Sequence, residues 1–439
     1  RFKLTLYNFC LHQSQSLSAE EQEFVLKRKQ VVLKSLNSLG IECTMSVPHI
    51  AVLGSGGGQR AAVGLLGSLY QMEKEGLLDT LLYLGGVSAS AWSMSTLYSD
   101  PEWSSNMDRA VSRLSGPSVM LEQALTWLDK RAKDEHFSLT DIWGVLTSFT
   151  RLMLSWQLDF RCLSEDGTNA FNPYPIYSAV DKNCLQHGPE KAKWFEITPH
   201  EAGFTDLGLF INTSHLGSRI HEAEPDGKGP EMDMVKLQGI SSSPLTFGKE
   251  MNKHISKNVE LFFKGVTICC VFPASSLIQK VFPLIWKWEW RTTENFLYNY
   301  SSKLLSSVHL SHLQSSDLLD IKQLRYWDLR CCEGAVVPPC VSHKEHLQLI
   351  DAGLMLNLPY PPFLGGKRDA DLLIALDYGS DEAFKVNYAA AVKKPFPEID
   401  NKILEERDWP KDCYVFEGKE KEPTIVYMPL FNRHNCKGL

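Results

Sequence analysis

Short apolar runs alternate with amphipathic segments in the first hundred residues. Ser18-Ala19-Glu20-Glu21 has the form of a capping box, and the charged run after it, to about Leu36, predicts an amphipathic helix. The apolar residues 50–53 predict a short strand that ends at a glycine-rich turn. Helical spacing then returns and stops at Gly76, and its apolar positions are Ala62, Leu65, Leu66, Leu69 and Met72.

The same order of strand, turn and helix repeats directly afterwards. Residues 81–84 predict a second strand that runs into Ser88, and residues 91–98 begin another helix. Such a repeat favours an α/β fold with a mainly parallel central sheet covered by helices. Two later apolar runs, at 372–377 and 425–428, predict further strands.

The segment from about 101 to 170 has a helical pattern. Trp127, Trp143 and Trp156 fall on its apolar faces, where tryptophan is more often a core residue than part of a ligand site. We expect a helical cap or lid inserted after the second glycine turn. Residues 222–260 are polar and interrupted by Pro and Gly, so they are predicted to form a divergent surface loop.

The chain has 439 residues, of which 44% are hydrophobic and 22% are charged. These values are typical of a globular protein with a sizeable core. Residues 1–17 show no pattern, and residues 18–439 are interpreted as one domain. The formal charge of −7 is modest and gives no reason to expect nucleic acid as a partner.

Cysteine usage and the amino terminus favour a reducing, intracellular setting. The 11 cysteines include the adjacent pairs Cys269-Cys270 and Cys331-Cys332, which suit a disulfide framework poorly. Nothing at the amino terminus resembles a signal peptide. Residues 266–286 are the most apolar stretch, but prolines and polar residues interrupt it, so buried core is favoured over a segment lying on a membrane.

Two glycine-dense turns carry the candidate chemistry. The first reads Gly54-Ser55-Gly56-Gly57-Gly58-Gln59-Arg60, and the second places Ser88 in Gly86-Val87-Ser88-Ala89-Ser90. A serine after a strand and before a helix, between small residues, is typical of a nucleophile elbow. A serine nucleophile also needs N–H donors for the developing oxyanion, and Gly57 and Gly58 have no side chains to block them. The pair of turns therefore indicates a serine acyl hydrolase.

Other interpretations of the first turn are weaker. Gln59 stands where the dinucleotide-binding spacing requires glycine, and no Gly-Lys-Ser/Thr follows the turn. A tight strand–helix turn without a ligand stays open. Arg60 is interpreted either as a phosphate-binding guanidinium or as an ordinary surface arginine.

The base that activates Ser88 has two candidates. Asp351 follows an apolar strand and precedes Gly353, so it is well placed to face a cleft. Partial burial would raise its pKa toward the value that a general base for serine needs. His434 follows Asp351 and fits the Ser–Asp–His order of the α/β-hydrolases. It lies in a polar end segment, which favours a solvated histidine.

Several motifs in order resemble the cytosolic phospholipase A2 family (group IV), and most of all its gamma-type member. They are Gly54-Ser55-Gly56-Gly57-Gly58-x-Arg60, Gly86-Val87-Ser88-x-Ser90-x-Trp92 and Asp351-Ala352-Gly353-Leu354-x-x-Asn357-x-Pro359-Tyr360-Pro361. The match extends through Pro173-Tyr174-Pro175, Thr198-Pro199-His200-x-x-Gly203-Phe204 and Asn295-Phe296-Leu297-Tyr298. The resemblance covers the chain from about residue 20 to its end.

The resemblance implies a patatin-like α/β fold and a Ser–Asp dyad. Ser88 would be the nucleophile, Asp351 the base, Gly57 and Gly58 the oxyanion hole, and Arg60 the ligand of the substrate phosphate. Such a dyad needs no histidine, metal or cofactor. It implies phospholipase A2 activity with lysophospholipase and transacylase side activities, and a protein of the cytoplasm that associates peripherally with intracellular membranes. Its expected partners are the phospholipid membrane surface and lysophospholipid.

Three departures from the family pattern bear on these expectations. Ala89 follows the nucleophile where the family usually has glycine, which leaves a non-catalytic lipid-binding relative as an alternative. Gln59 replaces an apolar residue, and the chain stops at Leu439 without a prenylation box.

Fewer than 50 residues precede the first glycine turn, whereas a C2 sandwich needs roughly 100. We therefore expect catalysis that is independent of calcium.

Overall fold

The structure is a computed structural model of the chain. It describes residues 12–13, 16–43, 46–98, 100–114, 121–133, 137–142, 144, 170–188, 191–217, 234–241, 293–298, 336–379, 395–399, 405–406 and 408–436.

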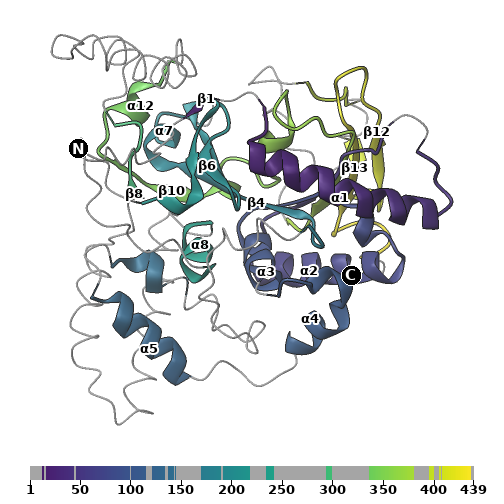
Figure 1. The fold of residues 1–439 in the computed structure, drawn as a ribbon, viewed down its shortest axis with the longest axis horizontal. Helices are drawn as coiled ribbons and strands as arrows, with labels where there is room; N and C mark the ends of the chain where they lie inside the picture. The colour runs from purple at the N-terminus through teal and green to yellow at the C-terminus, as the bar shows by residue number, and fades with distance from the viewer. Residues whose placement is uncertain are drawn as a thin grey trace, which may run out of the picture.

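One half of the large sheet consists of parallel strands, and it lies on the right in Figure 1, where β13 is labelled. Its strands lie in the order β13, β11, β2, β3 and β4, and each neighbouring pair is parallel. Their bounds are Thr424–Pro429 for β13, Leu372–Asp377 for β11, Ile50–Gly54 for β2, Tyr83–Gly86 for β3 and Tyr174–Asp181 for β4. Four of these strands match predicted apolar runs, although β3 begins two residues later than its run.

The rest of the large sheet is antiparallel, so the sheet as a whole is mixed. Beyond β4 it continues through β5, β6, β7 and β1, and β12 closes the opposite edge. These strands span Trp194–Ile197, Glu201–Phe204, Leu209–Asn212, His12–Gln13 and Tyr414–Phe416. The short strand β10 (Leu349–Asp351) also pairs antiparallel with β4, while β8 (Thr293–Glu294) and β9 (His346–Leu347) form a separate pair. The predicted parallel arrangement therefore holds for the half that carries the glycine turns.

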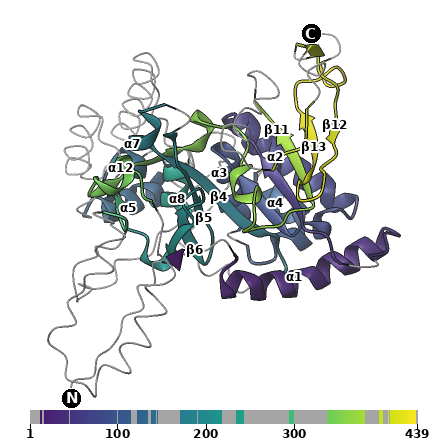
Figure 2. The same cartoon turned by 90° about the horizontal axis from the view of Figure 1, so that it is seen from above.

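Helices cover both faces of this sheet (Figures 1 and 2). Alternate strand residues point to opposite faces. Ala51 and Leu53 of β2 pack in one core with α1 (Ala19–Ser38), whereas Ile50 and Val52 pack in a second core with α2 (Gln59–Lys74) and α3 (Ala89–Leu97). The predicted capping box is confirmed at α1, because the Glu21 N–H donates to Ser18 Oγ at 3.1 Å.

Shorter helices lie in the less regular parts of the chain. The region predicted to form a helical cap contains α4 (Met107–Leu114) and α5 (Leu121–Arg131), and Trp127 of α5 is buried in the core. Trp143 and Trp156 lie outside the described residues. The predicted loop at 222–260 contains a helix, α8 (Met234–Ser241), because Leu237 and Ile240 are buried against the core that holds α3. Two four-residue helices are α7 (Lys182–Leu185) and α12 (Pro339–Ser342).

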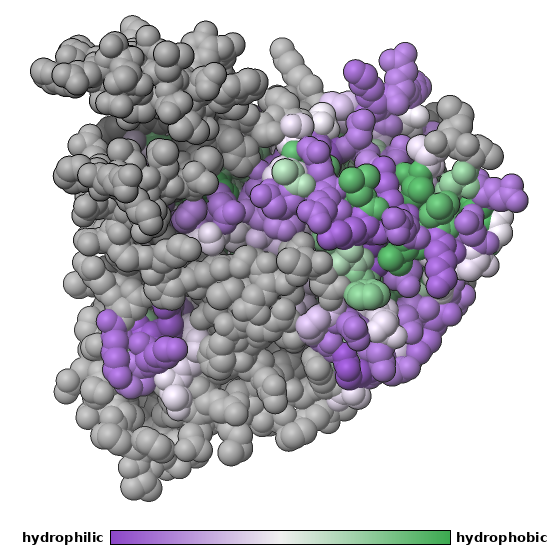
Figure 3. Space-filling model, viewed as in Figure 1, coloured by the Kyte–Doolittle hydropathy of each residue, from purple (hydrophilic) through white to green (hydrophobic). Residues whose placement is uncertain are grey.

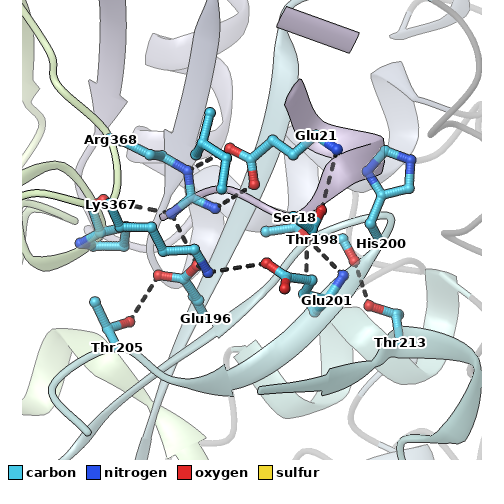
Figure 4. A network of polar contacts seen from close by, with 12 residues as sticks. Ser18, Glu21, Glu196, Thr198, His200, Glu201, Thr205, Thr213, Lys367 and Arg368 are labelled. Carbon is cyan, nitrogen blue, oxygen red and sulfur yellow. Dashed lines mark hydrogen bonds and ion pairs between the residues drawn. The ribbon is translucent and has the colours of Figure 1, made fainter. Parts of the chain in front are cut away.

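A buried ion network joins α1 to the antiparallel half of the sheet (Figure 4). Arg368 donates to Glu21 through Nε at 2.7 Å and Nη2 at 2.8 Å, and to Glu196 through Nη1 at 2.8 Å. Lys367 bridges Glu196 and Glu201 at 3.2 and 3.0 Å. All these groups are buried or nearly so, so each charge has its compensation inside the protein.

Among the described residues coloured in Figure 3, the surface around α1 is mainly polar, with scattered apolar patches. Exposed apolar side chains in or near α1 include Leu26, Leu39 and Ile41. Isolated residues of this kind are usual on a protein surface. Within the described residues, every helix is too short or too polar to cross a bilayer, and the apolar stretch at 266–286 lies outside those residues.

Candidate active site

The loops that carry the predicted chemistry meet at the carboxyl ends of the parallel strands. Gly54 at the end of β2 pairs with Gly86 at the end of β3, and Leu376 of β11 pairs with Gly54. The first glycine turn, the Ser88 turn and the turn after β11 therefore leave the sheet side by side. This edge is where α/β sheets bind their ligands.

Ser88 occupies a strained turn between β3 and α3. Its φ of 53° and ψ of −123° lie in a region that side-chain-bearing residues rarely adopt. Ser88 is the N-cap of α3, and its side chain is half-buried. A Cβ on Gly86 would press on the Met94 sulfur, so the residue before the turn must be small. The predicted elbow is thus present, and such strain is often stored at functional sites.

Strand register brings Asp351 to the same place. Gly86 of β3 pairs with Tyr177 of β4, while Asp351 of β10 pairs with Ala179, two residues further along β4. Since β5 occupies the other edge of β4 there, β10 continues the line of β3 just past its end. Ser88 lies the same two residues beyond Gly86, so the two predicted residues meet.

Two neighbouring groups act on the Asp351 carboxyl. The Gly353 N–H donates to Oδ1 at 2.7 Å, and the Ser88 hydroxyl lies close enough to the carboxyl to lower its pKa. Burial raises the pKa of Asp351 to about 6, although the Ser88 hydroxyl and the Gly353 N–H both act to lower it. A carboxyl with this pKa is ionised at neutral pH and is a better proton acceptor than an exposed aspartate.

The first glycine turn runs alongside Ser88. A Cβ on Gly56 would lie 3.1 Å from the Ser88 Cβ. Gly57 and Gly58 have φ values of 146° and 65°, and Gly58 is the N-cap of α2. Across the described part of the chain, neither of their N–H groups has a hydrogen-bond acceptor. Free N–H groups at a helix start next to a serine are suited to stabilising an oxyanion.

Three further residues fix the glycine turn, and motif spacing alone did not assign them this task. Asn357 accepts the Gly56 N–H at 3.1 Å through its backbone oxygen and donates to the Gly56 carbonyl at 3.3 Å through Nδ2. Ser55 Oγ accepts the Tyr378 N–H at 2.7 Å. Ser90 Oγ donates to the Ser55 carbonyl at 2.6 Å, which ties α3 to the turn. Asn357 and Ser90 could have been singled out from the sequence, because both stand in the motifs that carry the family resemblance.

Arg60 lies in the first turn of α2 and is held at two points. Its Nε donates to the Tyr378 carbonyl at 2.7 Å, and its guanidinium carbon lies 4.9 Å from the centre of the Phe431 ring. Its terminal nitrogens have no acceptor among the described residues. Arg60 is half-buried and Phe431 is exposed, so these nitrogens are near the surface beside the turn.

His434 is not part of this arrangement. It follows β13 in an irregular turn where its N–H donates to Asn432 Oδ1, and its side chain is exposed. The groups found to act on the Asp351 carboxyl are Ser88 and Gly353. In the described ranges there is also no cluster of three or more His, Cys, Asp or Glu side chains suited to a metal ion.

Comparisons with known proteins agree with this architecture. The family described as the lysophospholipase catalytic domain matches residues 50–397. Cytosolic phospholipase A2 gamma of Homo sapiens is 30% identical, over 96% of this chain and 86% of the relative. Cytosolic phospholipase A2 zeta of Homo sapiens is also 30% identical, over 95% of this chain and 53% of the relative.

Solved structures show the same fold. Human GIVD cytosolic phospholipase A2 has a TM-score of 0.71 at 22% identity, covering 97% of this chain and 59% of that one. The same human enzyme in complex with methyl gamma-linolenyl fluorophosphonate has a TM-score of 0.64 at 23% identity, covering 97% and 56%.

Proposed function

The chain belongs to the group IV cytosolic phospholipase A2 family, and from this premise we propose that it hydrolyses fatty-acyl esters of glycerophospholipids through Ser88 and Asp351. The observation that carries the proposal is the approach of these two side chains, which strand register brings together at a strained elbow and which shows in the effect of the Ser88 hydroxyl on the pKa of Asp351. A nucleophile in contact with a base of raised pKa, beside free N–H donors, is the arrangement that acyl transfer requires.

The reaction follows from this geometry. Asp351 accepts the Ser88 proton while Ser88 Oγ attacks the ester carbonyl, and the oxyanion that forms accepts hydrogen bonds from the Gly57 and Gly58 N–H groups. The carbonyl re-forms as the lysophospholipid leaves, and Asp351 returns the proton to its oxygen. Water, deprotonated by Asp351, then releases the fatty acid and restores the serine. A lysophospholipid hydroxyl in place of water gives a transacylated lipid.

The mechanism draws its nucleophile, base and oxyanion donors from the chain itself. We therefore propose that hydrolysis does not depend on calcium. Release of fatty acid from vesicles in a calcium chelator should equal release in calcium-containing buffer. A loss of turnover of dispersed monomeric lipid in the chelator would contradict this proposal.

We assign the substrate phosphate to Arg60. Its free terminal nitrogens and its anchored Nε leave a guanidinium ready for a bidentate contact. A hydrogen bond to a charged group contributes about 1.5–3 kcal/mol. Arg60→Gln should therefore lower kcat/KM for phospholipid by about 10- to 100-fold, while hydrolysis of a neutral soluble ester stays near wild type. Equal losses on both substrates would remove the phosphate assignment.

Ser88→Ala tests the central proposal. This variant should release no fatty acid from phospholipid vesicles and should not react with a fluorophosphonate probe. The wild type should take up one label per chain. Ser95→Ala is a matched control on the same helix, because the Ser95 hydroxyl donates to the Trp92 carbonyl. Full turnover by Ser88→Ala would end the proposal. A wild type that binds lipid but is not labelled would favour a non-catalytic lipid-binding protein.

A further inference from the structure

A disulfide joins two segments that border the strand carrying Asp351. Cys184 of α7 and Cys340 of α12 are bonded, with their Cα atoms 5.1 Å apart. The sequence had suggested reduced cysteines because its adjacent cysteine pairs suit a disulfide framework poorly, whereas the structure joins two positions 156 residues apart. Disulfides in a reducing compartment are usually transient or redox-sensing.

The two sulfur-bearing residues differ in accessibility. Cys184 is fully buried. Cys340 is half-buried and lines a cavity of about 460 Å³, together with Pro338, Pro339, His187, Lys191 and Lys193. A small molecule that enters this cavity therefore meets Cys340 first.

The cavity wall is mainly apolar, and the ionisable side chains that border it are basic. Lys191, Lys193 and His187 contribute to its wall, and no acidic side chain is among its lining residues. Among the described residues, neither lysine has a carboxylate partner. Nearby cations favour the thiolate form of an incoming thiol and attract a thiol whose other groups are anionic.

We propose that the cavity is a thiol-exchange site, at which a small anionic thiol of the glutathione class reacts with the Cys184–Cys340 disulfide at Cys340. The incoming thiolate forms a bond to the Cys340 sulfur, the bond between Cys340 and Cys184 breaks, and its electron pair leaves on the Cys184 sulfur, which takes a proton from water. A second thiolate attacks the small thiol's sulfur and releases Cys340. The net reaction reduces the protein disulfide and oxidises two thiols to their disulfide.

The disulfide is linked to the placement of Asp351. Asp181, the N-cap of α7, accepts the Cys184 N–H at 3.1 Å and the Gln348 N–H at 3.3 Å. The Lys182 N–H in turn donates to the Gln348 carbonyl at 2.9 Å. Since residue 348 directly precedes β10, the cross-link holds this strand against β4. Opening it should lower kcat more than it changes KM, a consequence that rests on the proposed function.

Peptide mapping of the full chain tests the exchange itself without any activity measurement. After equilibration in glutathione buffers of graded redox ratio and trapping by alkylation, the oxidised samples should contain the Cys184–Cys340 cross-link. Cys184→Ser should accumulate a glutathione adduct on Cys340, whereas Cys340→Ser should leave Cys184 largely unmodified. Cys413, a free and exposed cysteine, is the control for unselective reaction. Two free thiols at every ratio, or adducts mainly on Cys413, would overturn the proposal.

Charge selectivity tests the role of the cavity. One unit charge near 4 Å in water is worth about a fivefold change in rate. Lys193→Gln should therefore slow reduction by glutathione about fivefold and leave reduction by neutral 2-mercaptoethanol unchanged. Lys419→Gln, at an exposed site whose lysine pairs with Glu398, should change neither rate. Equal effects of Lys193→Gln on both thiols would show that the cavity does not select an anion.

Discussion

At the scale of single residues, Asp351 determines how the site should respond to pH. A carboxylate accepts the Ser88 proton only when it is ionised, and burial raises its pKa to about 6. The value of kcat/KM should therefore be constant at neutral pH, reach half its maximum near pH 6 and fall about tenfold per pH unit below that. The same shift means that this carboxyl lowers folding stability as the pH rises from about 3.8, its ordinary pKa, to about 6, and that the loss is complete above pH 6. A pH–rate profile on a soluble ester measures the midpoint.

A second buried carboxyl provides the control for this profile. Burial also raises the pKa of Asp181 to about 6, yet Asp181 caps α7 and does not contact Ser88. Asp181→Asn retains an oxygen that accepts the Cys184 N–H, so the midpoint should stay where it is. A midpoint that disappears in Asp181→Asn would assign the pH dependence to the wrong carboxyl.

The fit between Gly56 and Asn357 gives a second prediction at this scale. A Cβ on Gly56 would lie 2.5 Å from Asn357 Oδ1, which is closer than real Cβ contacts. Gly56→Ala should therefore displace the glycine turn and lower kcat, by about 100-fold if one oxyanion donor is lost. In the Asn357→Ala background the obstructing oxygen is gone, so the same substitution should cost less. A double-mutant cycle on kcat measures the difference, and strict additivity would mean that the two residues do not interact.

At the scale of elements, the ion network around Arg368 attaches α1 to the sheet (Figure 4). Burial alone would raise the pKa of Glu196, but Arg368 and Lys367 outweigh burial and lower it to about 2. Glu196→Gln leaves Arg368 and Lys367 short of a charge partner, so unfolding by urea should show a loss of about 3–5 kcal/mol. The ordinary Glu196 pKa is near 4.5, so wild-type stability contributed by this group should fall between about pH 4.5 and 2.

The exposed pair of Glu23 and Lys27 on α1 is the matched control. Both side chains are in solvent, where water and salt screen an ion pair. Glu23→Gln should leave the urea midpoint unchanged. If it lowers the midpoint as much as Glu196→Gln does, burial of the network is not what stabilises the attachment.

Element prediction succeeded where the signal is local. The capping box at Ser18, the strand before Gly54 and the turn at Ser88 depend on neighbouring residues, so the sequence contains them in full. Helix α8 was predicted as loop because residues 222–260 as a whole are polar and interrupted by Pro and Gly, although half of the residues of α8 are apolar. Packing of Leu237 and Ile240 against the core that holds α3 outweighs that local pattern, and no local rule anticipates it.

At the scale of the whole molecule, sequence patterns predicted the local parts of the site but not the contacts between distant segments. The Ser88 elbow and the glycine turn were identifiable by their composition. The partnership of Ser88 with Asp351 depends on β10 pairing with β4 directly past the end of β3, which is a property of the sheet. The sequence could therefore identify Asp351 as a candidate base, from the family resemblance and from its place between a strand and a glycine. It could not show that Asp351 lies beside Ser88. The Cys184–Cys340 pair is a stronger case, because only the folded chain brings those residues together.

The rim beside Arg60 leads to a prediction for the whole molecule at a lipid surface. Phe431 lies under the Arg60 guanidinium and is 41% exposed, and Trp409, whose carbonyl accepts the Arg433 side chain, is 50% exposed. Aromatic side chains at such a rim favour the membrane interface, and fully burying one contributes about 1.5–3 kcal/mol. Trp409→Ser should therefore weaken binding to phospholipid vesicles in a sedimentation assay by about 10-fold, with hydrolysis of a soluble ester unchanged. Leu26→Ser, at an exposed position on α1, should leave vesicle binding as it is. If it weakens binding instead while Trp409→Ser does not, the membrane contacts the face that carries α1 rather than the edge at which Ser88 and Asp351 meet.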